Sequence, residues 1–163
     1  MLLDRLGLTY VRHSYPHHRS TTSYGAEAAE LLGADPDQVF KTLLARVDGA
    51  LTVAMVPVST ALDLKALATA CGAKRATMAE PAQAERSSGY VIGGISPIGQ
   101  RTRLPSVLDR SAWDFSTVLV SGGRRGFDIE LSPDAGVGGG RGGGRGGGEG
   151  WRGGGGVSRR TAK

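Results

Sequence analysis

Apolar and polar positions alternate along the chain in a way that predicts strands interleaved with short helices. Apolar residues at helical spacing indicate helices, whereas runs rich in β-branched and aromatic residues indicate strands. The expected helices are a short opening segment that ends near residue 7 and residues 26–32, 64–71 and 81–88. The expected strands are residues 9–15, 39–47, 51–56, 104–108, 117–121 and 127–131. This order is typical of an α+β fold with a mixed, curved or barrel-like β-sheet and short flanking helices.

Local signals mark one hairpin and one helix. Asp48-Gly49 lies between two apolar runs and predicts a tight β-hairpin turn. Asp63 stands where it can cap the helix over residues 64–71. Cys71 continues the apolar face of that helix, so we expect it to be a small core residue and not a reactive thiol.

A glycine-rich stretch over residues 89–101 is the most informative segment. It follows an expected helix, precedes an expected strand, and contains Gly93, Gly94, Pro97 and Gly99. Glycine allows a backbone to approach a ligand closely, and proline fixes the chain locally. Such a loop offers a row of N–H groups that can hold a carbonyl, a carboxylate or a phosphate.

Charge divides the chain into a balanced body and a basic tail. The 163 residues carry a net charge of +5, yet residues 1–135 hold fourteen basic and fourteen acidic side chains. We therefore expect one globular domain over residues 1–135 and a separate segment over residues 136–163.

The apolar run at the start is broken by Asp4 and Arg5, which argues against a signal peptide, and no apolar stretch is long enough to span a bilayer. Cys71 is the single cysteine, which excludes an internal disulfide and is consistent with a cytoplasmic protein.

The segment after residue 135 departs sharply from the body. Ser132-Pro133-Asp134 predicts the start of a helix, but 15 of the last 28 residues are glycine. Because glycine disfavours helix by about 1 kcal/mol per residue, we expect no helix from Gly136 onward and a disordered tail. One interpretation is a genuine Gly/Arg-rich arm that adds affinity for RNA. The other is the product of a frameshift, which the abrupt change of composition favours.

Several segments, taken in order, resemble the YbaK/EbsC family, which is related to the editing domain inserted in bacterial prolyl-tRNA synthetases. They include Phe40-Lys41-Thr42-Leu43 and the glycine-rich stretch. The segments are residues 37–44, 62–65, 72–75, 86–100, 103–105 and 121–131. The resemblance covers about residues 1–133, and its nearest branch is the free-standing members that deacylate Cys-tRNA(Pro) and Cys-tRNA(Cys).

The resemblance implies a trans-editing enzyme that cleaves the ester of a mischarged tRNA. Family members use no metal, no cofactor and no enzyme nucleophile; the thiol of the mischarged cysteine, or a water, attacks the ester. The implied partner is the 3′ aminoacyl end of tRNA, with prolyl-tRNA synthetase as a further candidate. Two alternatives stay open, a deacylase for another substrate such as Ala-tRNA(Pro) and a non-catalytic RNA-binding module.

The same resemblance assigns the site residues. The implied catalytic residues are Lys41, Gly94 and Asp128. The implied substrate-binding residues are Tyr15, Tyr24, Thr42, Gly93, Ile95, Ser96, Pro97 and Gly123. Loop amides would polarise the ester carbonyl, and the two tyrosines would line the pocket or stack on the terminal adenine. Asp128 would orient the α-amine of the substrate or pair with Lys41.

Lys41 is notable from the residues alone. It interrupts an apolar strand, where a cation is costly unless it has an anionic partner or opens on a cleft. Alternation along the strand would equally place it in solvent, and the resemblance favours the cleft.

The histidines at 13, 17 and 18 have no matching acid or cysteine at metal-ligand spacing, so we expect no metal site. Arginines flank the two glycine-rich loops, where they can contact phosphates or simply form a solvated rim. They are Arg101, Arg103, Arg124 and Arg125.

Overall fold

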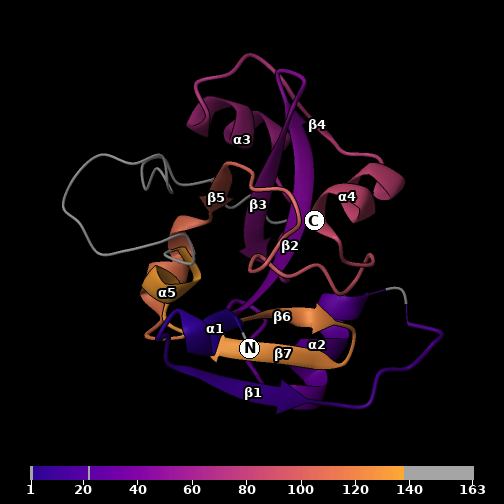
Figure 1. Ribbon diagram of the computed structural model, residues 1–163, viewed down its shortest axis with the longest axis vertical. Helices are drawn as coiled ribbons and strands as arrows, with labels where there is room; N and C mark the ends of the chain where they lie inside the picture. The colour runs from indigo at the N-terminus through magenta and orange to yellow at the C-terminus, as the bar shows by residue number, and fades with distance from the viewer. Residues whose placement is uncertain (1, 22, 138–163) are drawn as a thin grey trace.

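One mixed β-sheet organises the part of the chain that the computed structural model describes, residues 2–21 and 23–137 (Figure 1). Its strands are β1 (Tyr10–Ser14), β2 (Val39–Val47), β3 (Ala50–Pro57), β4 (Ala76–Met78), β5 (Ser106–Leu108), β6 (Val118–Arg124) and β7 (Phe127–Leu131). The helices are α1 (Leu2–Arg5), α2 (Tyr24–Leu32), α3 (Leu64–Ala70), α4 (Pro81–Ser88), α5 (Pro133–Val137) and the 3₁₀ turn η1 (Arg110–Asp114). The strands lie in the order β1-β7-β6-β2-β3-β5, with β4 on β2. The expected α+β class with a mixed sheet is confirmed.

The long strand β2 is the centre of the sheet. It pairs antiparallel with β3 and β4 and parallel with β6. At the expected β2–β3 turn, Asp48 and Gly49 both adopt positive φ, 47° and 87°. The Asp48 carboxylate also accepts hydrogen bonds from the N–H groups of Lys74 and Arg75. The hairpin tip is therefore tied to the segment between α3 and β4.

The sheet is strongly curled. Figure 1 shows β1, β7 and β6 running across the direction of β2 and β3. The parallel pairing of β2 with β6 is short, because only Val39 and Phe40 pair with Leu119 and Val120. Beyond Phe40 the two strands separate, and an irregularity in β6 between Ser121 and Arg124 breaks its register with β7. The strands thus part near the middle of the sheet.

Two helices fix β2 from either end. In α2, Ala28 and Ala29 pack against Val39 and Leu119, which places the start of this helix beside the point where the strands part. At the far end, Leu67 of α3 is buried in a cluster with strand residues from β2 and β3. The Asp63 side chain accepts a hydrogen bond of 2.9 Å from the N–H of Ala66, as the capping pattern predicts.

The expectation that Cys71 is a core residue is wrong. The helix ends at Ala70, and Cys71 is its C-terminal cap and is exposed. Helical spacing predicts which residues share a face, but it does not predict whether another element covers that face. Cys71 keeps a right-handed helical conformation, and its N–H still bonds to the carbonyl of Leu67. The chain turns only at Gly72, and it is Ala73 that packs against the cluster containing Leu67, so the side chain of Cys71 stays exposed.

Other differences concern short elements. The three-residue strand β4 was not expected, and β5 begins only at Ser106. The helix start at Ser132-Pro133 is confirmed, but α5 runs to Val137 and so includes Gly136, where no helix was expected. A single glycine in one turn is a small cost when Pro133 and the hydrogen bond from the Ala135 N–H to the Ser132 hydroxyl start the helix. Residues 138–163 of the predicted tail lie outside the described residues, so the domain boundary stays a prediction. None of the helices in the described residues is long and apolar enough to cross a membrane.

Candidate functional site

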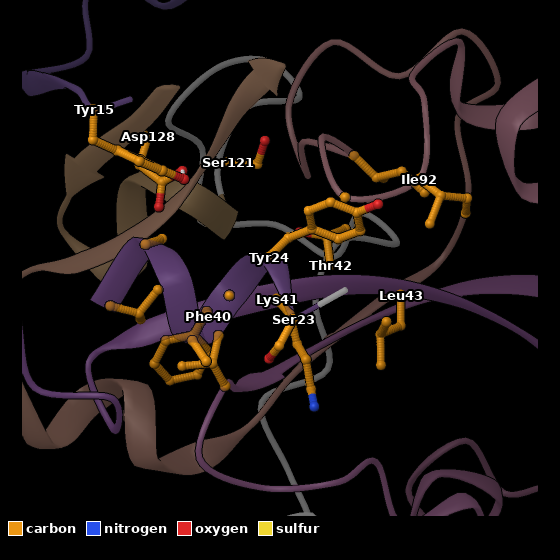
Figure 2. A pocket seen from close by; sticks show the side chains of 17 residues that line it. Tyr15, Ser23, Tyr24, Phe40, Lys41, Thr42, Leu43, Ile92, Ser121 and Asp128 are labelled. Carbon is orange, nitrogen blue, oxygen red and sulfur yellow. Dashed lines mark hydrogen bonds between the residues drawn. The ribbon is translucent and has the colours of Figure 1, made fainter. Parts of the chain in front are cut away.

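A cavity of about 300 Å³ opens where β2 and β6 separate. Figure 2 shows the side chains around it, which come from β2, β6, β7, the start of α2 and the glycine loop. Of the predicted residues, those that line it are Tyr15, Tyr24, Lys41, Thr42, Gly93, Ile95 and Asp128. Residues more than 100 positions apart in the sequence therefore meet at one place.

Lys41 supplies a cation to this cavity. It lies on β2 directly after the last residue that pairs with β6, and its side chain is half-buried. Burial lowers the pKa of the Lys41 ammonium. The ammonium makes no hydrogen bond or ion pair with any residue that the structure describes. A partly desolvated cation without an internal partner is suited to hold an anion or a developing negative charge.

Asp128 supplies a buried acid. Its side chain lies on β7, is 5% exposed, and accepts a hydrogen bond of 3.2 Å from the Tyr15 hydroxyl. Burial raises the pKa of Asp128 to about 6, although the hydrogen bond from Tyr15 and the nearby His13 oppose the shift. Burial and the adjacent Asp128 carboxylate raise the pKa of Tyr15 in turn.

The cation and the acid do not pair. Figure 2 shows Asp128 beside Tyr15, while the nitrogen of Lys41 points away from both. The interpretation in which Asp128 pairs with Lys41 is therefore wrong for this structure. The reason is positional, because Asp128 sits on β7 against Tyr15 whereas Lys41 extends from β2 on the other side of the opening.

Gly93 brings the glycine loop against the cavity. Its φ is +84°, and a Cβ at this position would lie 2.5 Å from the Tyr24 ring, so only glycine fits. The N–H of Gly93 has no hydrogen-bond partner among the described residues. Tyr24 thus packs on the loop, and its expected stacking on an adenine stays a prediction.

Four predicted residues lie outside this cavity. Gly94 donates its N–H to Val91 and packs so tightly on β6 that a Cβ would lie 2.9 Å from Cα of Arg124. Ser96 is buried, and its hydroxyl accepts a hydrogen bond from the N–H of Ile98 beside a second cavity of about 150 Å³. Gly123 faces Tyr90. Pro97 follows Ser96 and lines neither cavity. Their predicted roles in binding or catalysis remain predictions. In this structure Gly94, Ser96 and Pro97 belong to the glycine loop, whereas Gly123 lies on β6.

Thr42 lines the cavity with an unsatisfied hydroxyl. Its side chain is buried, and Oγ1 has no hydrogen-bond partner. A buried polar atom without a partner is costly, so a bound ligand that satisfies it gains affinity. This supports the expectation that Thr42 contacts the substrate.

Sequence reasoning missed part of the lining. The missed residues are Ser23, Gly25, Ala26, Ala28, Val39, Phe40, Leu43, Val58, Ile92 and Ser121. Half of them are apolar residues of expected strands and helices, where a pocket wall and a core look alike. Ser121 had a usable signal, because a hairpin through residues 122–126 places it opposite Asp128, as the register confirms.

Among the described residues, no serine or threonine hydroxyl of the cavity is hydrogen-bonded to a base, and the one hydroxyl that contacts a carboxylate is that of Tyr15, whose pKa is raised by burial and by Asp128. The Ser121 hydroxyl accepts a hydrogen bond from the Gly123 N–H, and the Thr42 hydroxyl has no partner. His13 and His17 are engaged with Glu130 and Glu27 at 2.9 and 2.8 Å. Within residues 2–21 and 23–137, no group of three or more histidine, cysteine or acidic side chains could hold a metal.

Comparison with known proteins finds a matching family, a similar sequence and similar solved structures. Residues 18–137 match the model of the aminoacyl-tRNA editing domain family. A protein of Enterococcus faecalis (strain V583), provisionally named Cys-tRNA(Pro)/Cys-tRNA(Cys) deacylase EbsC, is 41% identical over 109 residues, 66% of each chain. Two crystal structures, of hypothetical protein APE2540 and of a protein provisionally described as a trans-editing enzyme for prolyl-tRNA synthetase, are each 26% identical with a TM-score of 0.71. They cover 81% and 83% of this chain, and 86% and 85% of their own.

Proposed function

The chain belongs to the family of aminoacyl-tRNA editing domains, and from this we propose that it deacylates mischarged tRNA, with Cys-tRNA(Pro) and Cys-tRNA(Cys) as its substrates. The observation that carries the proposal is the pair of opposite, separated charges in one cavity, the unpaired Lys41 ammonium and the buried Asp128 carboxyl group. An aminoacylated tRNA end has matching charges, a cationic α-amine on the amino acid and anionic phosphate on the nucleotide. The ester to be cleaved lies between them.

The glycine loop would act on that ester. The free N–H of Gly93 donates to the ester carbonyl oxygen and stabilises the negative charge that develops on it during attack. Asp128 binds the α-ammonium group and thereby orients the amino acid. Lys41 holds the terminal phosphate or adds to the stabilisation of the oxyanion.

The attacking group would come from outside the protein. In the cysteine substrate, the thiol sulfur attacks its own carbonyl carbon, the ester C–O bond breaks, and the released ribose oxygen takes the thiol proton. The products are a cyclic thioester and a free tRNA end. For a substrate without a thiol, water attacks instead and leaves the free amino acid. Neither route needs a nucleophile from the protein, which fits the engaged or isolated hydroxyls of the cavity.

The cavity favours a small amino acid. Its volume of about 300 Å³ is at the lower end of the range for small-molecule sites. Apolar side chains such as Phe40 and Leu43 form part of the wall, and Thr42 offers one hydroxyl. Alanine fits such a space as well as cysteine does, so Ala-tRNA(Pro) is the alternative substrate. Docking on prolyl-tRNA synthetase would supply the tRNA selectivity that so small a cavity lacks.

The test is deacylation by the full chain. Cys-tRNA(Pro), Cys-tRNA(Cys), Ala-tRNA(Pro) and Pro-tRNA(Pro) are incubated separately with the protein, and the loss of each ester is followed against a protein-free control. We expect loss of the two cysteinyl esters and retention of the prolyl ester. Loss of the ester of Ala-tRNA(Pro) alone would indicate that the substrate is Ala-tRNA(Pro). Tight tRNA binding without loss of any ester would favour a non-catalytic RNA-binding module.

Lys41→Met is the diagnostic variant. Methionine keeps most of the length of the side chain and removes the charge whose burial is unfavourable. We expect deacylation to fall by about 100-fold or more, as for the loss of one group that stabilises an oxyanion, while thermal stability is unchanged or higher. Lys65→Met on the exposed side of α3 removes the same charge away from the cavity and should leave the activity unchanged. Full activity of Lys41→Met would contradict the assignment.

A further inference from the structure

Arg125 joins three segments around the mouth of the cavity. It lies in the turn between β6 and β7, and its Nε and Nη2 both donate to the carbonyl oxygen of Ile92, at 2.9 and 2.7 Å. Its Cζ lies 4.5 Å from the centre of the Tyr24 ring, within the range of a cation–π contact. One exposed side chain thus connects the β6–β7 hairpin, the glycine loop and the first residue of α2.

The carbonyl that Arg125 holds belongs to the peptide group that ends in the Gly93 N–H. In a trans peptide the C=O and the N–H point in opposite directions within one plane. Fixing the Ile92 oxygen therefore fixes the direction of the Gly93 N–H. That N–H has no partner among the described residues, and both Ile92 and Gly93 line the cavity.

The contact also strengthens the donor. A charged donor on the carbonyl oxygen polarises the whole peptide group, and hydrogen bonds arranged in such a chain reinforce one another. Other bonds hold the flanking atoms, since the Ile92 N–H donates to Oε1 of Glu85 at 2.9 Å and the Gly94 N–H donates to Val91. Within the described residues, Arg125 is the group that binds the C=O of this peptide.

We propose that Arg125 is a positioning residue for the deacylation, one that aims and polarises the Gly93 N–H toward the ester carbonyl. The inference rests on the proposed function, in which the Gly93 N–H stabilises the oxyanion. It assigns to Arg125 an effect on the rate of the chemical step, exerted through the peptide bond and without contact with the substrate.

A competing explanation is that Arg125 simply attracts tRNA phosphates. Arg124 separates the two explanations, because it is the adjacent residue, is also exposed and carries the same charge. The Arg124 guanidinium instead lies 5.0 Å over the Phe127 ring and makes no contact with the Ile92 carbonyl. Phosphate attraction predicts similar, salt-dependent increases in KM for both variants. Positioning predicts a fall in kcat for the Arg125 variant alone.

The experiment measures kcat and KM of the full chain and of Arg125→Ala, Arg125→Lys and Arg124→Ala on Cys-tRNA(Pro), at low and high salt. Deletion of an oxyanion donor costs about 10²–10³ in kcat, and Arg125→Ala only misdirects the donor, so we expect about a 10-fold fall in kcat. Lysine has one donor group in place of two, so the kcat of Arg125→Lys should lie between those of the wild type and Arg125→Ala. Added guanidinium ion should partly restore the kcat of Arg125→Ala. Arg124→Ala should keep the wild-type kcat.

An amide measurement tests the same inference without activity. The ¹⁵N and ¹H shifts of Gly93 should change in Arg125→Ala and stay in place in Arg124→Ala. An unchanged kcat in Arg125→Ala, or equal salt-dependent losses in KM for both alanine variants, would overturn the inference. An inactive wild-type protein would instead overturn the proposed function. Even then, unchanged Gly93 amide shifts in Arg125→Ala would overturn the inference about Arg125.

Discussion

Replacing Asp128 by asparagine should make the protein more stable at neutral pH. Asparagine has nearly the same shape, and its carbonyl oxygen can still accept the hydrogen bond from the Tyr15 hydroxyl. It removes the charge that burial disfavours. Burial raises the pKa of Asp128 from 3.8 to about 6, and each unit corresponds to about 1.4 kcal/mol, so ionised Asp128 lowers the free energy of unfolding by about 3 kcal/mol.

The direction of the pKa shift of Asp128 determines the pH range in which the difference in stability is visible. The folded state binds the proton more tightly than the unfolded state, because its pKa is the higher one. Stability from this group is therefore complete below about pH 4, is lost as the pH rises toward about 6, and stays lost above it. The asparagine variant has no such loss. Its advantage should be about 2–3 kcal/mol at pH 7.5 and should vanish near pH 4.

Urea denaturation of both proteins across pH 4–8 measures the difference. Asp114→Asn is the matched control, since Asp114 is exposed, and it should stay within about 0.5 kcal/mol of the wild type throughout. Deacylation by Asp128→Asn should fall, because the substrate α-ammonium loses its partner. An Asp128→Asn protein that is no more stable than the wild type at pH 7.5 would refute the reasoning. It would mean that the carboxylate is well solvated or meets a cation in solution.

Further predictions concern single positions. Gly93→Ala combines a positive φ of 84° with a collision against Tyr24, so it should cost about 2–4 kcal/mol of unfolding free energy by thermal or urea denaturation and abolish deacylation. Gly72→Ala has a φ of 65° with open space around the new methyl group, so it should cost only about 1 kcal/mol and remain active; equal costs for the two would contradict the packing argument. Cys71 should react with a thiol reagent in the folded protein, and Cys71→Ser should change stability by less than about 0.5 kcal/mol. A thiol that reacts only after denaturation would contradict its exposed position.

The elements that the sequence predicted well are those with local chemical signals. Asp48-Gly49 and Asp63 determine a turn and a helix start through their own backbone and side chains, and the structure has both. Cys71 was misplaced because helical periodicity does not predict whether another element covers the last residue of a helix. The strand β4 is three residues long, and only its pairing with β2 makes it a strand.

The site was predictable only in part, because ligand-facing and packing residues look alike in a sequence. The resemblance to the family led to Lys41, Tyr15 and Asp128, and the structure brings them to one cavity. Gly93 and Gly94 are neighbours of the same type with different surroundings. Gly93 faces the cavity, whereas Gly94 packs on the backbone of β6. That difference depends on a contact with a strand about thirty positions away, so no local pattern could reveal it.

The cavity contains three unfavourable features that a bound ligand can relieve. Lys41 is partly buried without an anion, Asp128 is ionised above about pH 6 against the effect of burial, and Thr42 has a hydroxyl without a partner. A Lys41–Asp128 ion pair would relieve the first two features, but the two side chains lie apart and Asp128 is bound to Tyr15 instead. A ligand with an anionic group at one end and an ammonium group at the other satisfies both charges. Because a ligand that binds only the folded state stabilises it, an aminoacylated nucleotide should raise the melting temperature, and the unacylated nucleotide, which lacks the ammonium group, should raise it less.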